Sequence, residues 1–89
     1  MQMLTVLGST GSIGVNTLDV VRRWKGRYAI HSLVAGNNVG LLAKQIVEFR
    51  PQLAVVADAA GREALAGELK GHGMAASEWP QLEIGRAHV

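Results

Sequence analysis

The chain has 89 residues, a formal net charge of +2 and no cysteine, which excludes a disulfide framework and a thiolate metal site. Its 48% hydrophobic and 18% charged residues are typical of a globular domain and exclude a disordered tail. The small charge surplus, the 4% aromatic content and the lack of an apolar run of ~18 residues exclude nucleic-acid and membrane partners. We expect a cytoplasmic protein.

The chain begins with the pattern of a buried strand that runs into a glycine-rich turn. Residues 3–7 are mostly apolar and β-branched, and the turn occupies residues 8–14. A helix is predicted from Gly14 to about residue 25, where basic residues suit the negative end of the helix dipole. Its apolar positions recur at helical spacing and are expected in the core: Val15, Leu18, Val21 and Trp24.

Two more strand–helix pairs follow. Residues 28–35 and 53–57 are predicted strands, and residues 39–49 and 60–70 are predicted helices. This alternation is typical of an α/β protein, and we expect a Rossmann-like doubly wound parallel sheet, incomplete, with about three β-α units. In the strand order 3-2-1-4 the first strand is central, so without a proper fourth strand residues 3–7 become an open apolar edge. After Gly71 the pattern weakens, although Met74 could begin a strand.

The glycine turn carries the clearest chemical signal. Gly8, Gly11 and Gly14 follow a predicted strand and open a predicted helix, which is the context of a dinucleotide-binding turn. We expect Gly8 to allow a backbone conformation that a β-carbon resists, Gly11 to admit a pyrophosphate, and Gly14 to allow close packing. The amides of the first helical turn would meet the anion, with hydroxyl donors from Thr10 and Ser12.

Two alternatives accompany this interpretation. The turn could be merely structural, since two residues rather than one separate the first two glycines. A phosphate-binding loop of an NTPase would need Gly-Lys-Ser/Thr at the helix start, and Val15 follows Gly14 here, which excludes it.

The end of the second strand indicates which cofactor binds. An acidic residue there would bind the ribose 2′-hydroxyl of NAD, but the sequence offers Gly36, Asn37 and Asn38 instead. Neutral amides and a glycine backbone can donate to a 2′-phosphate, so NADPH is favoured over NADH. Alternatively, or in addition, Asn37 and Asn38 cap the next helix.

Three segments together resemble one enzyme family, that of 1-deoxy-D-xylulose 5-phosphate reductoisomerase. They are Leu-Thr-Val-Leu-Gly-Ser-Thr-Gly-Ser-Ile-Gly at residues 4–14, Thr-Leu-Asp-Val-Val at 17–21 and Leu-Val-Ala-Gly-Asn-Asn-Val at 33–39. The resemblance implies an oxidoreductase that isomerises a sugar phosphate and reduces the product with NADPH to 2-C-methyl-D-erythritol 4-phosphate, in the non-mevalonate route to isoprenoid precursors. It also implies a divalent metal, Mg or Mn, and a homodimer for the full-length enzyme.

Carried over by position, the resemblance implies that Thr10, Gly11, Ser12 and Ile13 contact the phosphates and adenosine side of NADPH. Gly36, Asn37 and Asn38 would lie beside the 2′-phosphate, although family members often carry a basic residue where Asn37 stands. The family's catalytic and metal-binding residues lie downstream of this sequence. We therefore expect no catalytic residue and no metal ligand here, and no activity from the fragment alone.

The remaining candidates have ordinary structural explanations. Asp58 follows the third predicted strand and is expected to cap a helix. His31, His72 and His88 lack metal-ligand spacing. Other function classes stay open at this point: the start of another NADP-dependent dehydrogenase, such as a semialdehyde dehydrogenase, or a stand-alone nucleotide-binding module.

The last residues have an unusual feature. Residues 84–89, Ile-Gly-Arg-Ala-His-Val, can be encoded by a string that resembles a widely used sequencing adapter, and Glu83 fits the preceding letters. We expect residues 1–82 to be the N-terminal part of an NADPH-binding domain and residues 83–89 to be a non-native tail. The alternative is a genuine short terminus.

Overall fold

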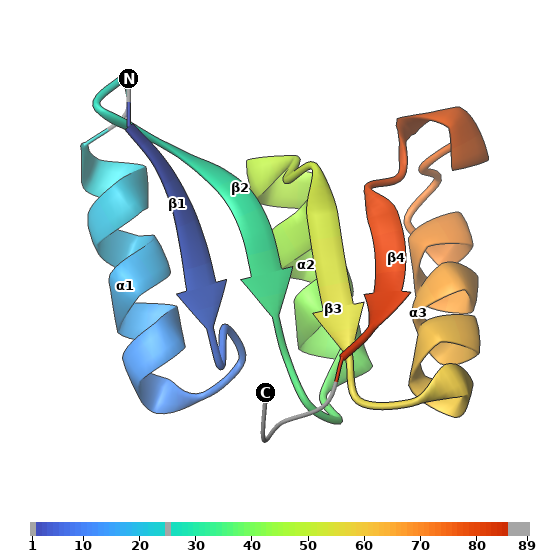
Figure 1. Cartoon of the computed structure of the whole chain (residues 1–89). Helices are drawn as coiled ribbons and strands as arrows, with labels where there is room; N and C mark the ends of the chain where they lie inside the picture. Colours follow the sequence, from blue (N-terminus) through green and yellow to red (C-terminus); the bar gives the residue numbers. More distant parts are fainter. Residues whose placement is uncertain (1, 25, 86–89) are drawn as a thin grey trace.

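The computed structural model describes residues 2–24 and 26–85 and contains three β-α units followed by a fourth strand (Figure 1). In chain order the elements are β1 (Gln2–Leu7), α1 (Ser12–Arg23), β2 (Tyr28–Val34), α2 (Val39–Phe49), β3 (Leu53–Val56), α3 (Ala59–Gly71), the 3₁₀ helix η1 (Ala76–Glu78) and β4 (Gln81–Ile84). The predicted strands and helices of the first three units are confirmed, with ends that differ by one or two residues. Met74, where the sequence left a strand open, is followed by η1 instead.

The four strands form one parallel sheet in the order β1-β2-β3-β4. Leu7 is in register with Val34, and Val34 with Val55, so the first three strands end at the same level. The expected order 3-2-1 of the first three strands is confirmed, and the additional strand β4 pairs with β3 and not with β1. Within the described residues β1 is therefore an edge strand, as expected for an incomplete Rossmann-like sheet.

All three helices pack on the same face of the sheet. The crossovers step in one direction from β1 to β4, and right-handed crossovers of this kind place their helices on one side. Figure 1 shows α2 behind β2 and β3, with α1 and α3 on either side of it. The core lies between these layers, and its fully buried side chains are Leu33, Leu42, Ala43, Ile46, Ala54, Leu65 and Leu69.

Helix α1 lies at the β1 end of this layer and buries only a narrow stripe. Leu18 and Val21 are buried, as predicted, but Val15 and Trp24 are 41% and 52% exposed. Their predicted place in the core is wrong, because only α2 flanks α1 and no element of the described chain covers its outer side. Trp24 instead lies with its ring 5.8 Å from the guanidinium of Arg27.

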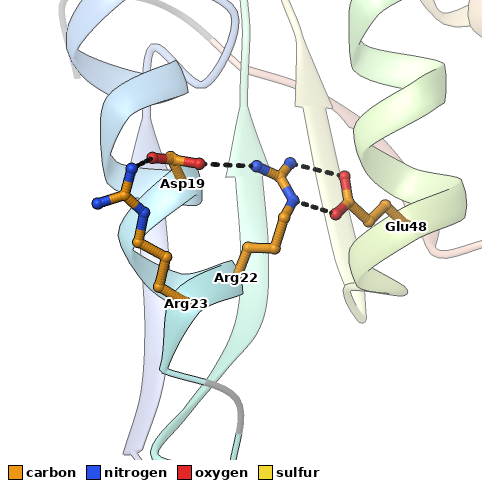
Figure 2. Close-up of polar contacts among 4 residues, drawn as sticks. All are labelled: Asp19, Arg22, Arg23 and Glu48. Carbon is orange, nitrogen blue, oxygen red and sulfur yellow. Dashed lines mark hydrogen bonds and ion pairs between the residues drawn. The ribbon is translucent and has the colours of Figure 1, made fainter.

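An ion-pair network joins α1 to α2 (Figure 2). Arg22 donates to both carboxylate oxygens of Glu48, with Nη2 2.8 Å from Oε1, and to Asp19 at 3.2 Å. Asp19 also pairs with Arg23 at 3.1 Å. The hydrogen bond with Glu48 is the main cause that raises the pKa of Arg22. Because Glu48 lies on α2, this pair joins the C-terminal end of α1 to α2, and since both side chains are more than 40% exposed its contribution to stability is small.

Candidate functional site

The two predicted cofactor-binding segments come together at one edge of the sheet. Residues 8–14 follow β1 and residues 36–38 follow β2, and both strands point to the lower edge in Figure 1. The Ser9 amide donates to the Val34 carbonyl at 3.0 Å, which joins the first turn directly to β2. Ligands of open α/β sheets bind outside the carboxyl ends of the strands, so the segments lie where a nucleotide is expected.

Two of the three glycines are required by geometry. Gly8 has φ of +65°, a left-handed conformation that side chains other than glycine adopt at a cost. A β-carbon on Gly14 would lie 2.2 Å from the Gly8 carbonyl oxygen and 2.6 Å from the Ser9 Cα. The role predicted for Gly8 is confirmed, whereas Gly14, expected to let the helix pack against the sheet, makes its close approach to the backbone of the turn.

Gly11 differs from the other two. Its φ is −81°, and a β-carbon there would lie 3.4 Å from the Gly8 carbonyl oxygen, at the limit of ordinary contact. The apo geometry therefore gives no internal reason for a glycine at this position. Its predicted role beside a pyrophosphate stays a prediction.

The turn leaves several amides available. Gly11 N–H donates to the Gly8 carbonyl at 2.9 Å, and Ser9 N–H is held by β2. Within the described chain, the N–H groups of Thr10, Ser12 and Ile13 have no hydrogen-bond partner. Ser12 and Ile13 are exposed and Thr10 is half-buried. Three free donors within four residues at a helix start are an arrangement that can bind a phosphate.

The electrostatics of this edge favour an anion. Residues 8–14 and 36–38 contain no ionisable side chain, and neither α1 nor α2 carries an acidic residue in its first turn. Gly11 caps α1 without a side-chain hydrogen bond, so the positive end of the helix dipole is not occupied by the protein. At α3, by contrast, Asp58 accepts from Gly61 N–H at 2.7 Å, which confirms its predicted capping role.

The second segment has a structural role that the sequence suggested. Asn38 caps α2 by accepting from the Leu41 amide at 3.2 Å, so the capping interpretation is confirmed for this residue. Gly36, Asn37 and Asn38 are all exposed. The Asn37 carbonyl accepts from the Val39 amide at 3.0 Å. Contact of these three residues with a 2′-phosphate stays a prediction.

One residue that contacts the turn was not predicted from the sequence. Gln45 on α2 is 6% exposed, and its side-chain Nε2 donates to the Ser9 carbonyl at 2.8 Å. The available signal was its position, three residues after Leu42, on the buried face of an apolar helix. A polar side chain at such a position needs a hydrogen-bond partner.

Metal ligands do not gather in the described part of the chain. No group of three or more His, Cys, Asp or Glu side chains that could hold a metal ion occurs among residues 2–24 and 26–85. His88 lies outside the described residues. So do the other residues of 86–89, which make up most of the tail predicted to be non-native. Glu83 and Ile84, the first two residues of that tail, form part of β4. Over the same described residues, no helix is long and apolar enough to cross a bilayer.

Comparison with known proteins gives a consistent result. A family model for 1-deoxy-D-xylulose 5-phosphate reductoisomerase matches residues 4–85. Curated proteins of that name from Solibacter usitatus and Chlorobaculum tepidum are 58% and 56% identical over 98% and 81% of this chain. The chain spans only about a fifth of their length, 22% and 19% respectively.

Solved structures agree with the sequence matches. A DOX-P reductoisomerase in complex with NADPH, fosmidomycin and magnesium superposes with a TM-score of 0.81 and 29% identity, over 96% of this chain and 20% of the other. The 1-deoxy-D-xylulose 5-phosphate reductoisomerase from Zymomonas mobilis in complex with NADPH gives 0.77 and 34%, over 94% and 21%. The matched region therefore has the same Rossmann-like α/β fold as enzymes that were solved with NADPH.

Proposed function

The chain belongs to the 1-deoxy-D-xylulose 5-phosphate reductoisomerase family, and we propose that it is the segment of such an enzyme that binds NADPH. The observation that carries the proposal is the turn after β1. There the N–H groups of Thr10, Ser12 and Ile13 lack partners within the described chain, at the start of a helix without an anionic cap. A diphosphate supplies the acceptors and the negative charge that this position lacks.

The glycines support the same assignment. Gly8 and Gly14 give the turn its tight shape, and Gly11 leaves its outer surface free of a side chain where the diphosphate would approach. The hydroxyls of Thr10 and Ser12 add donors beside the amides. Ile13 is 81% exposed and offers an apolar contact to the adenosine side of the cofactor.

The segment after β2 supports NADPH rather than NADH. It contains no carboxylate that would repel a 2′-phosphate, and it lies beside the glycine turn because Ser9 and Val34 are hydrogen-bonded. Gly36 and Asn37 would supply backbone and amide donors, and Asn38 would keep its capping role. Since no arginine or lysine lies within residues 36–38, the preference would rest on neutral donors.

The activity of the whole protein is a proposal drawn from the family. We propose an oxidoreductase that isomerises a sugar phosphate and reduces it to 2-C-methyl-D-erythritol 4-phosphate in isoprenoid precursor biosynthesis, acting as a cytoplasmic homodimer. Bound NADPH would supply the hydride. The described residues do not fit a Mg or Mn site, so the metal and the catalytic groups would come from the rest of such an enzyme. The chain would bind and orient the cofactor.

The test is a titration of the 89-residue chain with NADPH and with NADH, in which calorimetry measures the affinity for each cofactor. We expect NADPH to bind more tightly. Ser12→Asp places a carboxylate among the free amides and should weaken both cofactors about tenfold or more, although an acidic residue in a first helical turn stabilises the helix. Asn37→Asp should weaken NADPH selectively. Ser77→Asp, on exposed η1, is the matched control and should change neither affinity.

The proposal fails if the chain binds neither cofactor. Equal affinities for NADPH and NADH would remove the role proposed for residues 36–38. Unchanged binding by Ser12→Asp would remove the role of the first turn of α1.

A further inference from the structure

Gln45 makes an unusual contact for a residue in the middle of a helix. It is 6% exposed, between the fully buried Leu42 and Ile46 of α2. Its Nε2 reaches a backbone carbonyl 36 residues earlier in the chain, that of Ser9, at 2.8 Å. Burial of an amide side chain is unfavourable unless it is hydrogen-bonded, so this residue needs a reason beyond core packing.

The hydrogen bond does not satisfy the side chain fully. Gln45 Oε1 is buried without a hydrogen-bond partner among the described residues, and so is the Ser9 hydroxyl. An apolar side chain of similar size would avoid the unpaired oxygen and would fill the same space. The hydrogen bond to the turn is therefore the one polar contact that the described structure gives this side chain.

The contacted carbonyl controls one of the free amides. A peptide group is planar, so the Ser9 carbonyl and the Thr10 N–H lie in one plane and point in opposite directions across a trans bond. Ser9 itself is fully buried, and its own N–H is fixed by Val34 at 3.0 Å. The bond from Gln45 therefore acts on the same peptide group that carries the Thr10 N–H.

We propose that Gln45 is a positioning residue for the cofactor turn: by holding the Ser9 carbonyl it directs the Thr10 N–H toward the bound diphosphate. The inference rests on the proposed cofactor role of the turn. Gln45 acts from inside the helix layer and does not touch the cofactor. It links α2 to the turn proposed to bind the diphosphate. Helix α2 also begins directly after residues 36–38, which are proposed to lie beside the 2′-phosphate.

The test compares Gln45→Met with two controls in the 89-residue chain. Methionine has a similar length but cannot donate. Ser9→Ala removes the unpaired hydroxyl and keeps the carbonyl, and Ile46→Val removes one methylene from the neighbouring buried position. Only Gln45→Met loses the proposed tether. Gln45→Asn, which is one methylene shorter and cannot reach Ser9 in the same way, repeats the test if the methionine variant does not fold.

The first readout needs no cofactor. Amide hydrogen exchange is measured at Ser9, whose N–H donates to Val34, at Gly11, whose N–H donates to Gly8, and at Leu33 in the core. We expect Gln45→Met to lower protection at Ser9 and Gly11 about five- to tenfold relative to Leu33, the range for the loss of one hydrogen bond. A merely structural role would lower protection at all three positions together, as Ile46→Val should.

The second readout separates the two ends of the cofactor. Gln45→Met should bind NADPH about tenfold more weakly and should bind adenosine 2′-monophosphate, which has no diphosphate, as the unsubstituted chain does. Unchanged turn protection, or equal losses for both ligands, overturns the proposal. Local loss of protection in a chain that never binds NADPH supports the tether and overturns the proposed function instead.

Discussion

Replacement of Gly14 by alanine is the perturbation that the structure predicts most sharply. The added β-carbon would lie 2.2 Å from the Gly8 carbonyl oxygen, 2.6 Å from the Ser9 Cα and 2.8 Å from the Gly8 carbonyl carbon. Carbon contacts are normally ~3.5 Å or more, so the start of α1 must move by about 1 Å. All three obstructing atoms are backbone, and none can rotate away as a flexible side chain would.

The expected cost follows from this geometry. Overpacking of a buried position costs about 1–3 kcal/mol, and a clash with three backbone atoms belongs at the upper end of that range. A chain of this size has a free energy of unfolding on the order of 5 kcal/mol. Gly14→Ala should therefore remove about half of the stability, and the shift of α1 should weaken NADPH binding as well.

Urea unfolding followed by far-UV circular dichroism measures the loss, with Gly67→Ala as the matched control. Gly67 is exposed within α3, and a β-carbon there would meet nothing within 4 Å. Alanine at that helix position should stabilise the chain by about 1 kcal/mol. If Gly14→Ala unfolds at the same urea concentration as the unsubstituted chain, the close approach of α1 to the turn is refuted.

Three further outcomes are expected. Asp58→Ala removes the cap on the Gly61 amide and should lower the free energy of unfolding by about 1 kcal/mol in thermal denaturation, whereas no change would refute the cap. A double-mutant cycle of Arg22→Ala and Glu48→Ala should show a favourable coupling that falls at high salt. An arginine guanidinium is ordinarily charged well above neutral pH, and the hydrogen bond with Glu48 raises the pKa of Arg22 further, so the coupling should persist from neutral pH to about pH 10. Met3→Lys, on the open β1 edge, should reduce self-association of the isolated chain in sedimentation, and a stable monomer before substitution would contradict that expectation.

The three β-α units were predictable because each has a strong local period. Leu42 and Ile46 recur at helical spacing and are fully buried, and short apolar runs that end at a glycine or an aspartate mark the strands. The turn after β1 was predictable for the same reason, since its glycines lie between a strand and a helix. These signals are local, so they can be recognised in the sequence without knowing which elements pack against each other.

The errors concern features that depend on neighbours. Trp24 and Val15 have the right spacing for a core face, but periodicity does not reveal that α1 lies at the end of the helix layer with one side open. The place of the fourth strand was also not predicted, because a β-α-β unit looks the same in sequence whichever way it steps along the sheet. Only the pairing of β4 with β3 determines it.

Two smaller features were missed for related reasons. Strand β4 is four residues long, and two of them, Gln81 and Glu83, are polar and exposed, so its strand character comes from pairing rather than from composition. Gln45 was read as part of a helix and not as a contact to the turn. Its partner is a backbone carbonyl, which has no side-chain signature in the sequence.

The central claim is that the open amides at the start of α1 bind the cofactor diphosphate. A ¹H–¹⁵N NMR titration of the chain with NADPH tests it most directly. The amide resonances of Thr10, Ser12 and Ile13 are expected to move most, with downfield proton shifts typical of new hydrogen bonds. Shifts confined to other positions, such as the opposite end of the sheet around Tyr28 and Phe49, would contradict the claim.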